Sequence, residues 1–337
     1  MRAAWYEKQG PASEVLQLGN LPTPEPEQGE VRVKLSFSGV NPSDTKRRLG
    51  FGGQKMAYPA IVPHSDGSGI IDQVGTGVPK NRIGERVWIY CGQWERAHGT
   101  AAEYISIRED HAIPLPDQIE LMSGACLGIP AVTAHRALLT DGSLNNLTVL
   151  VTGGAGAVGN YAIQLAKWGG AEQVITTCSS PEKENHARAA GADLVINYKE
   201  EDVSAKILEA TDGNGVDRIV EVAFGANLPS TVALLKDNGI ISAYGSDIEP
   251  TPVLPFYPMM LKNCVLRWVF MYKIPEDDFA NACHDLNDWL KKSSTHHMVS
   301  KIFPLEKIAE AHKFLESGEA TGNVIVSIGG ENETLKK

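Results

Sequence analysis

The stretch Thr148-Val-Leu-Val-Thr-Gly-Gly-Ala-Gly-Ala-Val-Gly-Asn-Tyr-Ala-Ile-Gln-Leu-Ala-Lys167 decides the fold of this 337-residue chain. Its first five residues are rich in β-branched side chains and predict a buried strand. From Val158 onward the apolar residues recur at helical spacing, which predicts a helix that packs back onto the strand. Between strand and helix, Gly154, Gly156 and Gly159 form a G-x-G-x-x-G turn.

This turn predicts a dinucleotide-binding site, because strand, glycine turn and helix follow one another in the order that such sites require. The first glycine permits the tight turn, the second lets a pyrophosphate approach the backbone, and the third lets helix and strand pack closely. The N-terminus of the helix adds free N–H groups for the phosphates. The alternative is a purely structural turn, and the second strand expected at Gln173 to Thr177 argues against it.

Strands and helices alternate from Thr148 onward, whereas about the first 120 residues are mostly β, with turn residues at the spacing of a barrel or sandwich. The expected later strands, with helices between them, make a doubly wound parallel sheet. They lie at residues 148–152, 173–177, 193–197, 218–222, 239–243 and 264–270. A last apolar strand at Val324 to Ile328 is not needed there and is expected to return to the first domain. We therefore expect a first domain at 1–124, a dinucleotide-binding domain at 125–268 and a return to the first domain at 269–337.

Charge and cysteine content narrow the class of protein. A formal net charge of −10 argues against a nucleic-acid surface, which needs clustered Lys and Arg. The five cysteines are odd in number and never form C-x-x-C, which argues against a disulfide framework and favours the reducing cytoplasm. The first residues lack the apolar core of a signal peptide, and no run is long enough to span a membrane. We expect a cytoplasmic protein whose partner is a small molecule.

The end of the second strand of the sheet favours NADPH over NADH. An acidic residue about twenty positions after the glycine turn usually receives the ribose hydroxyls of NAD. Here the strand ends in Cys178, Ser179 and Ser180, and no carboxylate occurs before Glu182. A 2′-phosphate would therefore meet no repulsion, while Ser179 and Ser180 can donate hydrogen bonds and Lys183 can supply charge. The alternative is that one of the two serines only caps the next helix, which is compatible with both cofactors.

Four further blocks stand in order along the chain: Ser38-Gly-Val-Asn-Pro-Ser-Asp44, Ile61-Val-Pro-His-Ser-Asp-Gly-Ser-Gly69, Leu127-Gly-Ile-Pro-Ala-Val-Thr-Ala134 and Gly153-Gly-Ala-Gly-Ala-Val-Gly159. Together they resemble the zinc-free, zeta-crystallin-like quinone oxidoreductases of the medium-chain dehydrogenase/reductase superfamily. The resemblance covers about Arg2 to Ile328. It implies a GroES-like, mostly β catalytic domain made from both ends of the chain, a central Rossmann domain, a cleft between them, and a homodimer or homotetramer.

The zinc-binding members of that superfamily hold catalytic zinc through Cys, His and Cys. The positions that match here are Asn41, Ser65 and Ile129, which cannot build a tetrahedral zinc site, so we expect no metal. His64 lies one position before the expected ligand and is interpreted as a loop or pocket-lining residue, since a single imidazole is not a metal site. Without a Lewis acid, alcohol oxidation loses the group that lowers the hydroxyl pKa, whereas an electrophilic acceptor does not need that group.

The resemblance also implies which residues bind the cofactor and the substrate. The implied cofactor residues are Ala155, Gly156, Ala157, Val158, Cys178, Lys183, Tyr198, Asn227, Tyr244, Gly245, Ser246, Val269, Phe270 and Met271. By composition, Tyr244 and Phe270 are equally good core residues.

On the substrate side, the resemblance suggests Asn41 and Asp44 as polar contacts, with Thr133 near the nicotinamide. Asp44 is equally a candidate turn residue after a proline. Lys46 and Gly52 stand where family members often carry tyrosines.

The activity that the resemblance implies is zinc-independent transfer of reducing equivalents from NADPH to a quinone. An alkenal or enone reductase on the same scaffold is the alternative, because it would share every cofactor residue and differ only in the substrate pocket. A non-catalytic NADPH-binding or RNA-binding protein is a third interpretation, since a dinucleotide fold does not guarantee catalysis. The acidic net charge argues against an RNA-binding role.

Overall fold

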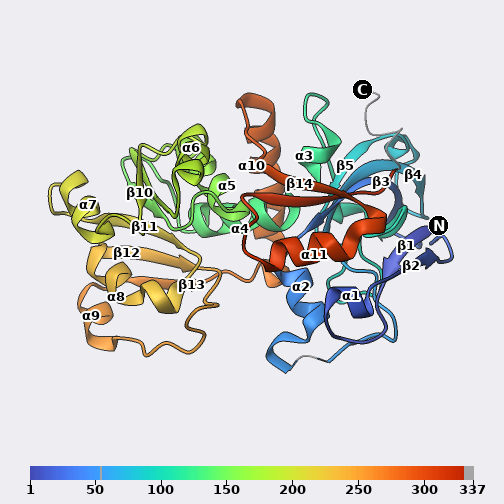
Figure 1. Cartoon of the computed structure of the whole chain (residues 1–337). Coiled ribbons are helices and arrows are strands. Elements are labelled where there is room, and N and C mark those ends of the chain that lie inside the picture. The colour runs from blue at the N-terminus through green and yellow to red at the C-terminus, as the bar shows by residue number, and fades with distance from the viewer. Residues whose placement is uncertain (54, 330–337) are drawn as a thin grey trace. The chain divides into compact units, whose positions relative to one another are not determined.

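The computed structural model describes residues 1–53 and 55–329 and forms two units (Figure 1). One unit contains Met1–Ile129 and the described residues from His297 onward, and the other contains Pro130–His296. The sequence predicted domain limits after residues 124 and 268. Both lie before the corresponding junctions of the two units, which follow residues 129 and 296. As limits of independently folding domains they stay predictions.

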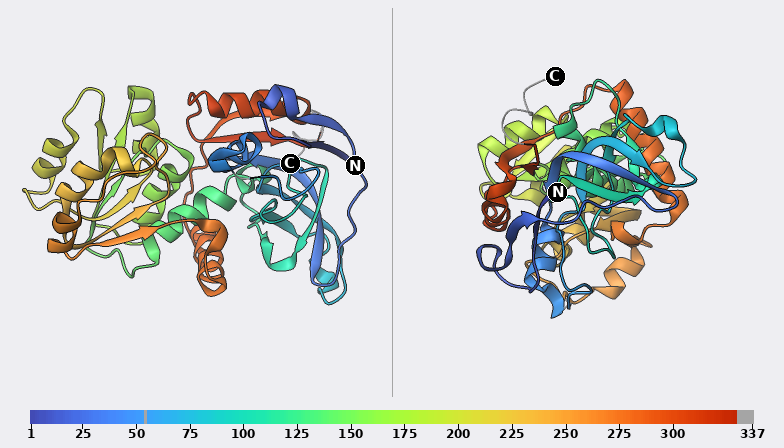
Figure 2. Two further views of the ribbon diagram at one scale, coloured as in Figure 1. Left: turned by 90° about the horizontal axis from the view of Figure 1, so that it is seen from below. Right: turned by 90° about the vertical axis from the view of Figure 1, so that its right-hand side faces the viewer.

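Within the described ranges, the second unit contains a six-stranded parallel sheet in the order β10-β9-β8-β11-β12-β13. Its strands are β8 (Thr148–Val151), β9 (Gln173–Cys178), β10 (Leu194–Asn197), β11 (Val216–Glu221), β12 (Leu235–Ala243) and β13 (Val265–Trp268). Numbered along the chain, this order is 3-2-1-4-5-6, which is the order of dinucleotide-binding domains. Helices cover both faces of the sheet (Figures 1 and 2). The predicted doubly wound sheet is confirmed.

The helices of this unit differ in how the polar groups at their ends are paired. They are α4 (Gly128–Leu139), α5 (Ala157–Trp168), α6 (Pro181–Ala189), α7 (Val203–Ala210), α8 (Phe224–Leu234), α9 (Phe256–Leu261), the short η4 (Met271–Lys273) and α10 (Glu276–Lys292). Asp202 caps α7, because its carboxylate accepts the N–H of Ala205 at 3.0 Å. At the end of α4, the buried Arg218 of β11 donates to the carbonyls of Leu138 and Asp141. This arginine therefore satisfies carbonyl groups that the helix leaves unpaired.

In the part of the first unit that the structure describes, a seven-stranded sheet runs in the order β14-β15-β3-β4-β5-β7, with β6 also paired to β3, and β1 and β2 form a separate pair. The strands of the two sheets are β1 (Arg2–Trp5), β2 (Gln17–Asn20), β3 (Glu30–Val40), β4 (Asp66–Val74), β5 (Arg86–Ile89), β6 (Tyr104–Arg108), β7 (Ala112–Pro114), β14 (Val299–Pro304) and β15 (Asn323–Ser327). β15 pairs antiparallel with β3, so a strand from near the end of the chain lies beside the first long strand. The two sheets together confirm the predicted fold class.

The helices of the first unit are short. They are α1 (Ala12–Val15), α2 (Pro42–Leu49), α3 (Leu121–Gly124) and α11 (Ile308–Glu316), with single turns at η1 (Phe51–Gly53), η2 (Lys80–Arg82), η3 (Glu109–His111) and η5 (Leu305–Lys307). Within the described ranges, none of the chain's helices has the length and apolar composition that crossing a bilayer requires.

The sequence did not predict α2, and the interpretation of Asp44 as a turn residue is wrong. Asn41 is the N-cap of this helix and Pro42 occupies its first position, where the missing N–H costs nothing. The carboxylate of Asp44 accepts the backbone N–H of Asn41 at 2.8 Å, in a capping box. The pair therefore starts a helix where a turn was the simpler expectation.

Candidate functional site

The residues expected to bind the cofactor follow the carboxyl ends of the parallel strands. Because parallel strands end at one edge of their sheet, these residues share that edge. The turn 153–159 follows β8, Cys178 ends β9, Tyr198 follows β10, residues 244–246 follow β12 and residues 269–271 follow β13. The strand order reverses between β8 and β11, which is where ligands bind in such sheets.

The glycine turn has two glycines that packing requires and one that it does not. A Cβ atom on Gly154 would lie 2.1 Å from the hydroxyl oxygen of Thr176, and one on Gly159 would lie 2.3 Å from the carbonyl oxygen of Gly153. A Cβ on Gly156 would meet just one described neighbour within 4 Å, the same carbonyl oxygen, at 3.3 Å. Gly156 is exposed, so the space beside its backbone is open to a ligand.

The start of α5 offers hydrogen-bond donors to such a ligand. Its N-cap is Gly156, which has no side chain to accept the first N–H groups of the helix. The N–H groups of Ala157 and Val158 have no partner within the helix, and the positive end of the helix dipole lies beside them. Turn and helix together therefore fit an anionic phosphate.

Beside the turn, the end of β9 carries the residues expected at the adenosine phosphate. Ser180 caps α6, because its hydroxyl accepts the N–H of Lys183 at 3.4 Å, so the capping interpretation holds for this serine. Lys183 lies half-buried in the first turn of α6. Tyr198 is 53% exposed, and its N–H donates to the carbonyl of Cys178 at 3.1 Å. These residues therefore lie at neighbouring strand ends, with Ser179 between the cysteine and the capping serine.

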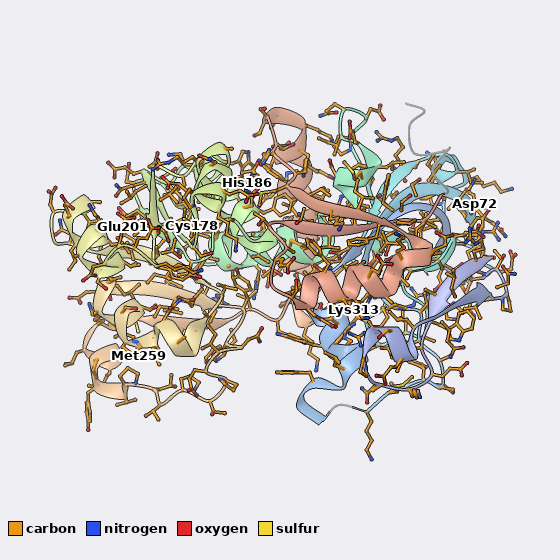
Figure 3. All side chains as sticks on the ribbon, in the orientation of Figure 1. Asp72, Cys178, His186, Glu201, Met259 and Lys313 are labelled. Atoms are coloured by element: carbon orange, nitrogen blue, oxygen red, sulfur yellow. The ribbon has the colours of Figure 1, made fainter. Side chains whose placement is uncertain are left out.

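Cys178 is a buried thiol and not an activated nucleophile. Burial raises the pKa of this thiol. The turn that follows the neighbouring strand β10 is held by Glu201, whose carboxylate accepts the N–H of Asn197 at 2.9 Å (Cys178 and Glu201 are labelled in Figure 3).

Glu221 is a functional candidate that the sequence analysis missed. It is fully buried at the end of β11, and it accepts the hydroxyl of Thr152 at 2.9 Å and the N–H of Ala223 at 2.7 Å. Its carboxylate also accepts the side-chain amide of Asn227 at 2.9 Å. One donor of Asn227 is therefore used inside the fold. The signal available in the sequence was a carboxylate directly after the apolar pair Ile219-Val220.

The two remaining segments of this edge differ in exposure. The turn 244–246 is tied to α8, because the hydroxyl of Ser246 accepts the N–H of Gly225 at 2.9 Å. After β13, Val269 and Met271 are buried, whereas the side chain of Phe270 is 52% exposed. The interpretation of Phe270 as a core residue is therefore wrong.

In the first unit, the structure brings the two expected substrate contacts together. The side-chain amide of Asn41 donates to Asp66 at 2.8 Å, and the other carboxylate oxygen of Asp66 accepts the N–H of Ile129 at 2.8 Å. Asn41, Asp44 and Asp66 are all buried. Thr133, the third expected residue, is buried in α4 of the second unit. Asp66 lies inside the block quoted from Ile61 to Gly69, but its role was not predicted.

These residues do not fit a zinc ion. The amide of Asn41 is bound to Asp66, and Ile129 offers no ligand atom. His64 is fully buried, with its ring nitrogens on Ser38 and His312. Within residues 1–53 and 55–329, His, Cys, Asp and Glu side chains form no group of three that could hold a metal.

Asp44 and Asp66, the two aspartates bound to Asn41, bind protons more tightly than exposed carboxyl groups do. Burial raises the pKa of Asp44 to about 6, against the opposing charge of Arg47 and the N–H of Asn41. Burial also raises the pKa of Asp66 well above its usual value, and the charge of Asp44 adds to this shift. One oxygen of Asp44, Oδ1, has no partner among the described residues.

Known proteins share both units. A family model for the alcohol dehydrogenase GroES-like domain matches residues 27–117, and one for zinc-binding dehydrogenases matches residues 157–288. A quinone oxidoreductase of Rattus norvegicus is 32% identical over 326 residues, which are 95% of this chain and 95% of that one.

Two solved structures illustrate the likeness of the fold. An Escherichia coli quinone oxidoreductase complexed with NADPH matches with a TM-score of 0.83 and 25% identity over 97% of this chain and 100% of that chain. An NAD-dependent alcohol dehydrogenase matches with a TM-score of 0.86 and 29% identity over 98% of this chain and 100% of that chain.

The GroES-like sheet and the dinucleotide-binding sheet are the architecture of a medium-chain dehydrogenase/reductase, a class of oxidoreductases. Within this superfamily, the chain belongs to the zeta-crystallin-like quinone oxidoreductase group. The family predicted from the sequence is confirmed.

We predict that Asp44→Asn changes the pH dependence of stability. The folded-state pKa of about 6 lies above the unfolded value of about 3.9, so the proton stabilises the folded state at low pH and this contribution is lost as pH rises through 6. From about pH 4.5 to about pH 7.5, wild type should lose about 2 kcal/mol of unfolding free energy relative to the variant. Urea denaturation at each pH measures this difference.

The control is Asp237→Asn, because Asp237 is an exposed residue of β12. Its difference from wild type should stay constant over the same pH range. Parallel curves for wild type and Asp44→Asn would contradict the prediction.

Proposed function

We propose that this protein transfers reducing equivalents from NADPH to a quinone without the help of zinc. The observation that carries the proposal is the turn at Gly156, whose open backbone and helix N-terminus fit a pyrophosphate. The quinone oxidoreductases at about 30% identity support the acceptor, and the NADPH complex of the Escherichia coli relative supports the cofactor.

Each group of residues would then have a separate task. The turn 154–159 and the start of α5 would bind the pyrophosphate, while Ser179, Lys183 and Tyr198 would bind the 2′-phosphate. Asn227, the turn 244–246 and the backbone of residues 269–271 would orient the nicotinamide half. When bound, NADPH supplies the reducing equivalents.

On the acceptor side, the proposal uses Asn41, Asp44 and Thr133. Asn41 and Asp44 would contact the acceptor, and Thr133 would lie near the nicotinamide. Below about pH 6, Asp44 holds its proton, and its unpaired oxygen is the atom from which a proton could pass to a reduced product. An exposed aromatic ring follows this helix, because Phe51 of η1 is 59% exposed and its ring centroid lies 5.3 Å from the amine of Lys46 on α2.

We propose the cytoplasm as the compartment, because none of the five cysteines, all of which lie in the described ranges, forms a disulfide.

The test of the acceptor is steady-state oxidation of NADPH with 1,2-naphthoquinone, 1,4-benzoquinone and a 2-alkenal. We expect turnover with the quinones. Turnover with the alkenal alone would favour the enone-reductase alternative, because both activities share the cofactor residues. Binding of NADPH without turnover on any of the three acceptors would favour a non-catalytic protein.

For the cofactor, we predict that Lys183→Ala raises the KM for NADPH by about tenfold or more and leaves the KM for NADH within about twofold. The reason is that the 2′-phosphate alone distinguishes the two nucleotides. Lys206→Ala is the control, because Lys206 pairs with Glu209 on α7, away from the strand ends. Equal losses for NADPH and NADH would contradict the assignment of Lys183.

We also propose that two or four copies of this chain associate, and that β13 forms the contact. Among the described residues β13 pairs with β12 alone, so its other edge presents unpaired backbone groups. Large apolar side chains are exposed around it: Val265 (45%), Trp268 (62%), Phe256 (65%) and Leu261 (77%). An apolar edge that can pair with its own copy about a two-fold axis suits a homo-oligomer.

We predict that Trp268→Glu shifts the protein toward a monomer, because a charge in such an interface would be desolvated without a partner. Size-exclusion chromatography with light scattering measures the mass. Ile83→Glu is the control, since Ile83 is 51% exposed on the other unit. A wild-type monomer, or a variant of unchanged mass, would contradict the proposed contact.

A further inference from the structure

Two histidines of the first unit are fully buried against each other, and the proposed function uses neither. His64 lies in the loop before β4 and His312 lies in α11, and their Nε2 atoms are 2.8 Å apart. Arg48, in the last turn of α2, is also fully buried beside them. Buried polar groups of this kind must satisfy one another, so their hydrogen bonds can be followed atom by atom.

Arg48 fixes the direction of these bonds. Its Nε donates to Nδ1 of His312 at 3.2 Å, and a guanidinium can only donate. Nδ1 of His312 is therefore an acceptor, and the ring proton lies on Nε2, which donates to Nε2 of His64. The proton of His64 must then lie on Nδ1, which donates to the hydroxyl of Ser38 at 2.8 Å. Burial supports the neutral forms, since it lowers the pKa of His64 to about 3 and that of His312 well below its usual value.

The bonds continue to the backbone of Asp66. The hydroxyl of Ser38 lies 2.7 Å from that of Thr100, which itself donates to the carbonyl oxygen of Asp66. Since the proton of Thr100 is used there, Ser38 donates to Thr100. Five hydrogen bonds thus run in one direction from Arg48 to the peptide of Asp66.

This series closes into a ring through α2. The carboxylate of Asp66 accepts the amide of Asn41 at 2.8 Å, and Asn41 is the N-cap of the helix whose last turn contains Arg48. Arg48 also donates to the carbonyl of Gly10 and pairs with Glu316 of α11. Both ends of α2 are therefore held by one connected set of buried polar groups.

We infer that Arg48, His312 and His64 are positioning residues that hold α2 and fix the side chain of Asn41 through Asp66. The inference rests on the proposed function for its consequence in catalysis, because that function places Asn41 at the acceptor. Loss of His312 leaves Nε of Arg48 without its acceptor and Nε2 of His64 without its donor. It therefore loosens the amide of Asn41 without touching the nucleotide-binding edge.

The first test reads the proton positions directly. Nitrogen-15 NMR of the imidazole groups in the full-length protein, assigned with His64→Asn and His312→Asn, should show the proton on Nε2 of His312 and on Nδ1 of His64. A charged ring near neutral pH, or the opposite tautomer at either histidine, would overturn the inference. This measurement does not depend on activity.

The second test follows Asn41 in His312→Leu and His312→Gln. Hydrogen exchange of the Asn41 side-chain amide should be faster by about tenfold or more in the leucine variant. The glutamine variant, whose amide can still donate to His64, should exchange at a rate closer to that of wild type. His111→Leu is the control, because His111 lies half-buried against Tyr90 in the same unit and outside this ring. Unchanged exchange in His312→Leu would overturn the inference.

Kinetics then separate the inference from the proposed function. With NADPH and 1,2-naphthoquinone, His312→Leu should lower kcat by about tenfold and leave the Kd for NADPH within about twofold of wild type. An unchanged kcat together with faster exchange would overturn the catalytic part of the inference. A wild-type protein that reduces no acceptor would overturn the proposed function, while the proton positions and the exchange of Asn41 would still decide the inference.

Discussion

The nucleotide-binding unit depends on one constraint. Glycines, which have no side chain, must stand in the turn where the order of the parallel strands reverses. Gly154 lets the turn approach β9, and Gly159 lets helix α5 approach the turn, so closely that a Cβ on either glycine would collide with its neighbours. That approach leaves Gly156 exposed at the N-terminus of α5, with helix N–H groups unpaired. The same close packing that stabilises the fold thus produces the space and the donors that a phosphate needs.

Local sequence was sufficient to predict the parallel sheet and the glycine turn of this unit, but neither α9 nor the role of Glu221. The strands of the sheet are short runs rich in apolar residues, α5 has apolar residues at helical spacing, and the glycine turn has a fixed pattern, so the local sequence revealed them. Helix α2 escaped prediction because Asn41 and Pro42 are equally typical of turns. Only the reciprocal bonds of Asn41 and Asp44 decide between the two, and the sequence alone does not show whether they form.

The buried polar groups could not be predicted, because their partners lie far away along the chain. His64 and His312 are 248 positions apart, and Asp66 accepts the N–H of Ile129 across 63 positions. No periodicity or spacing connects such residues. Asp66 was visible within a conspicuous block, but its two partners come from different elements, and only the folded chain shows that each of its carboxylate oxygens accepts an N–H.

The two halves of the proposed site therefore differ in what determines them. Phosphate binding uses backbone geometry and helix N–H groups, which tolerate many side chains and recur in unrelated enzymes. The acceptor side uses buried side chains that bind one another, and desolvation makes an unpaired group such as Oδ1 of Asp44 costly. Asp66 illustrates this cost, since two N–H donors only partly offset its burial and its pKa stays raised. A change on this side alters several partners at once, so differences in acceptor between relatives should arise there, while the nucleotide edge is retained.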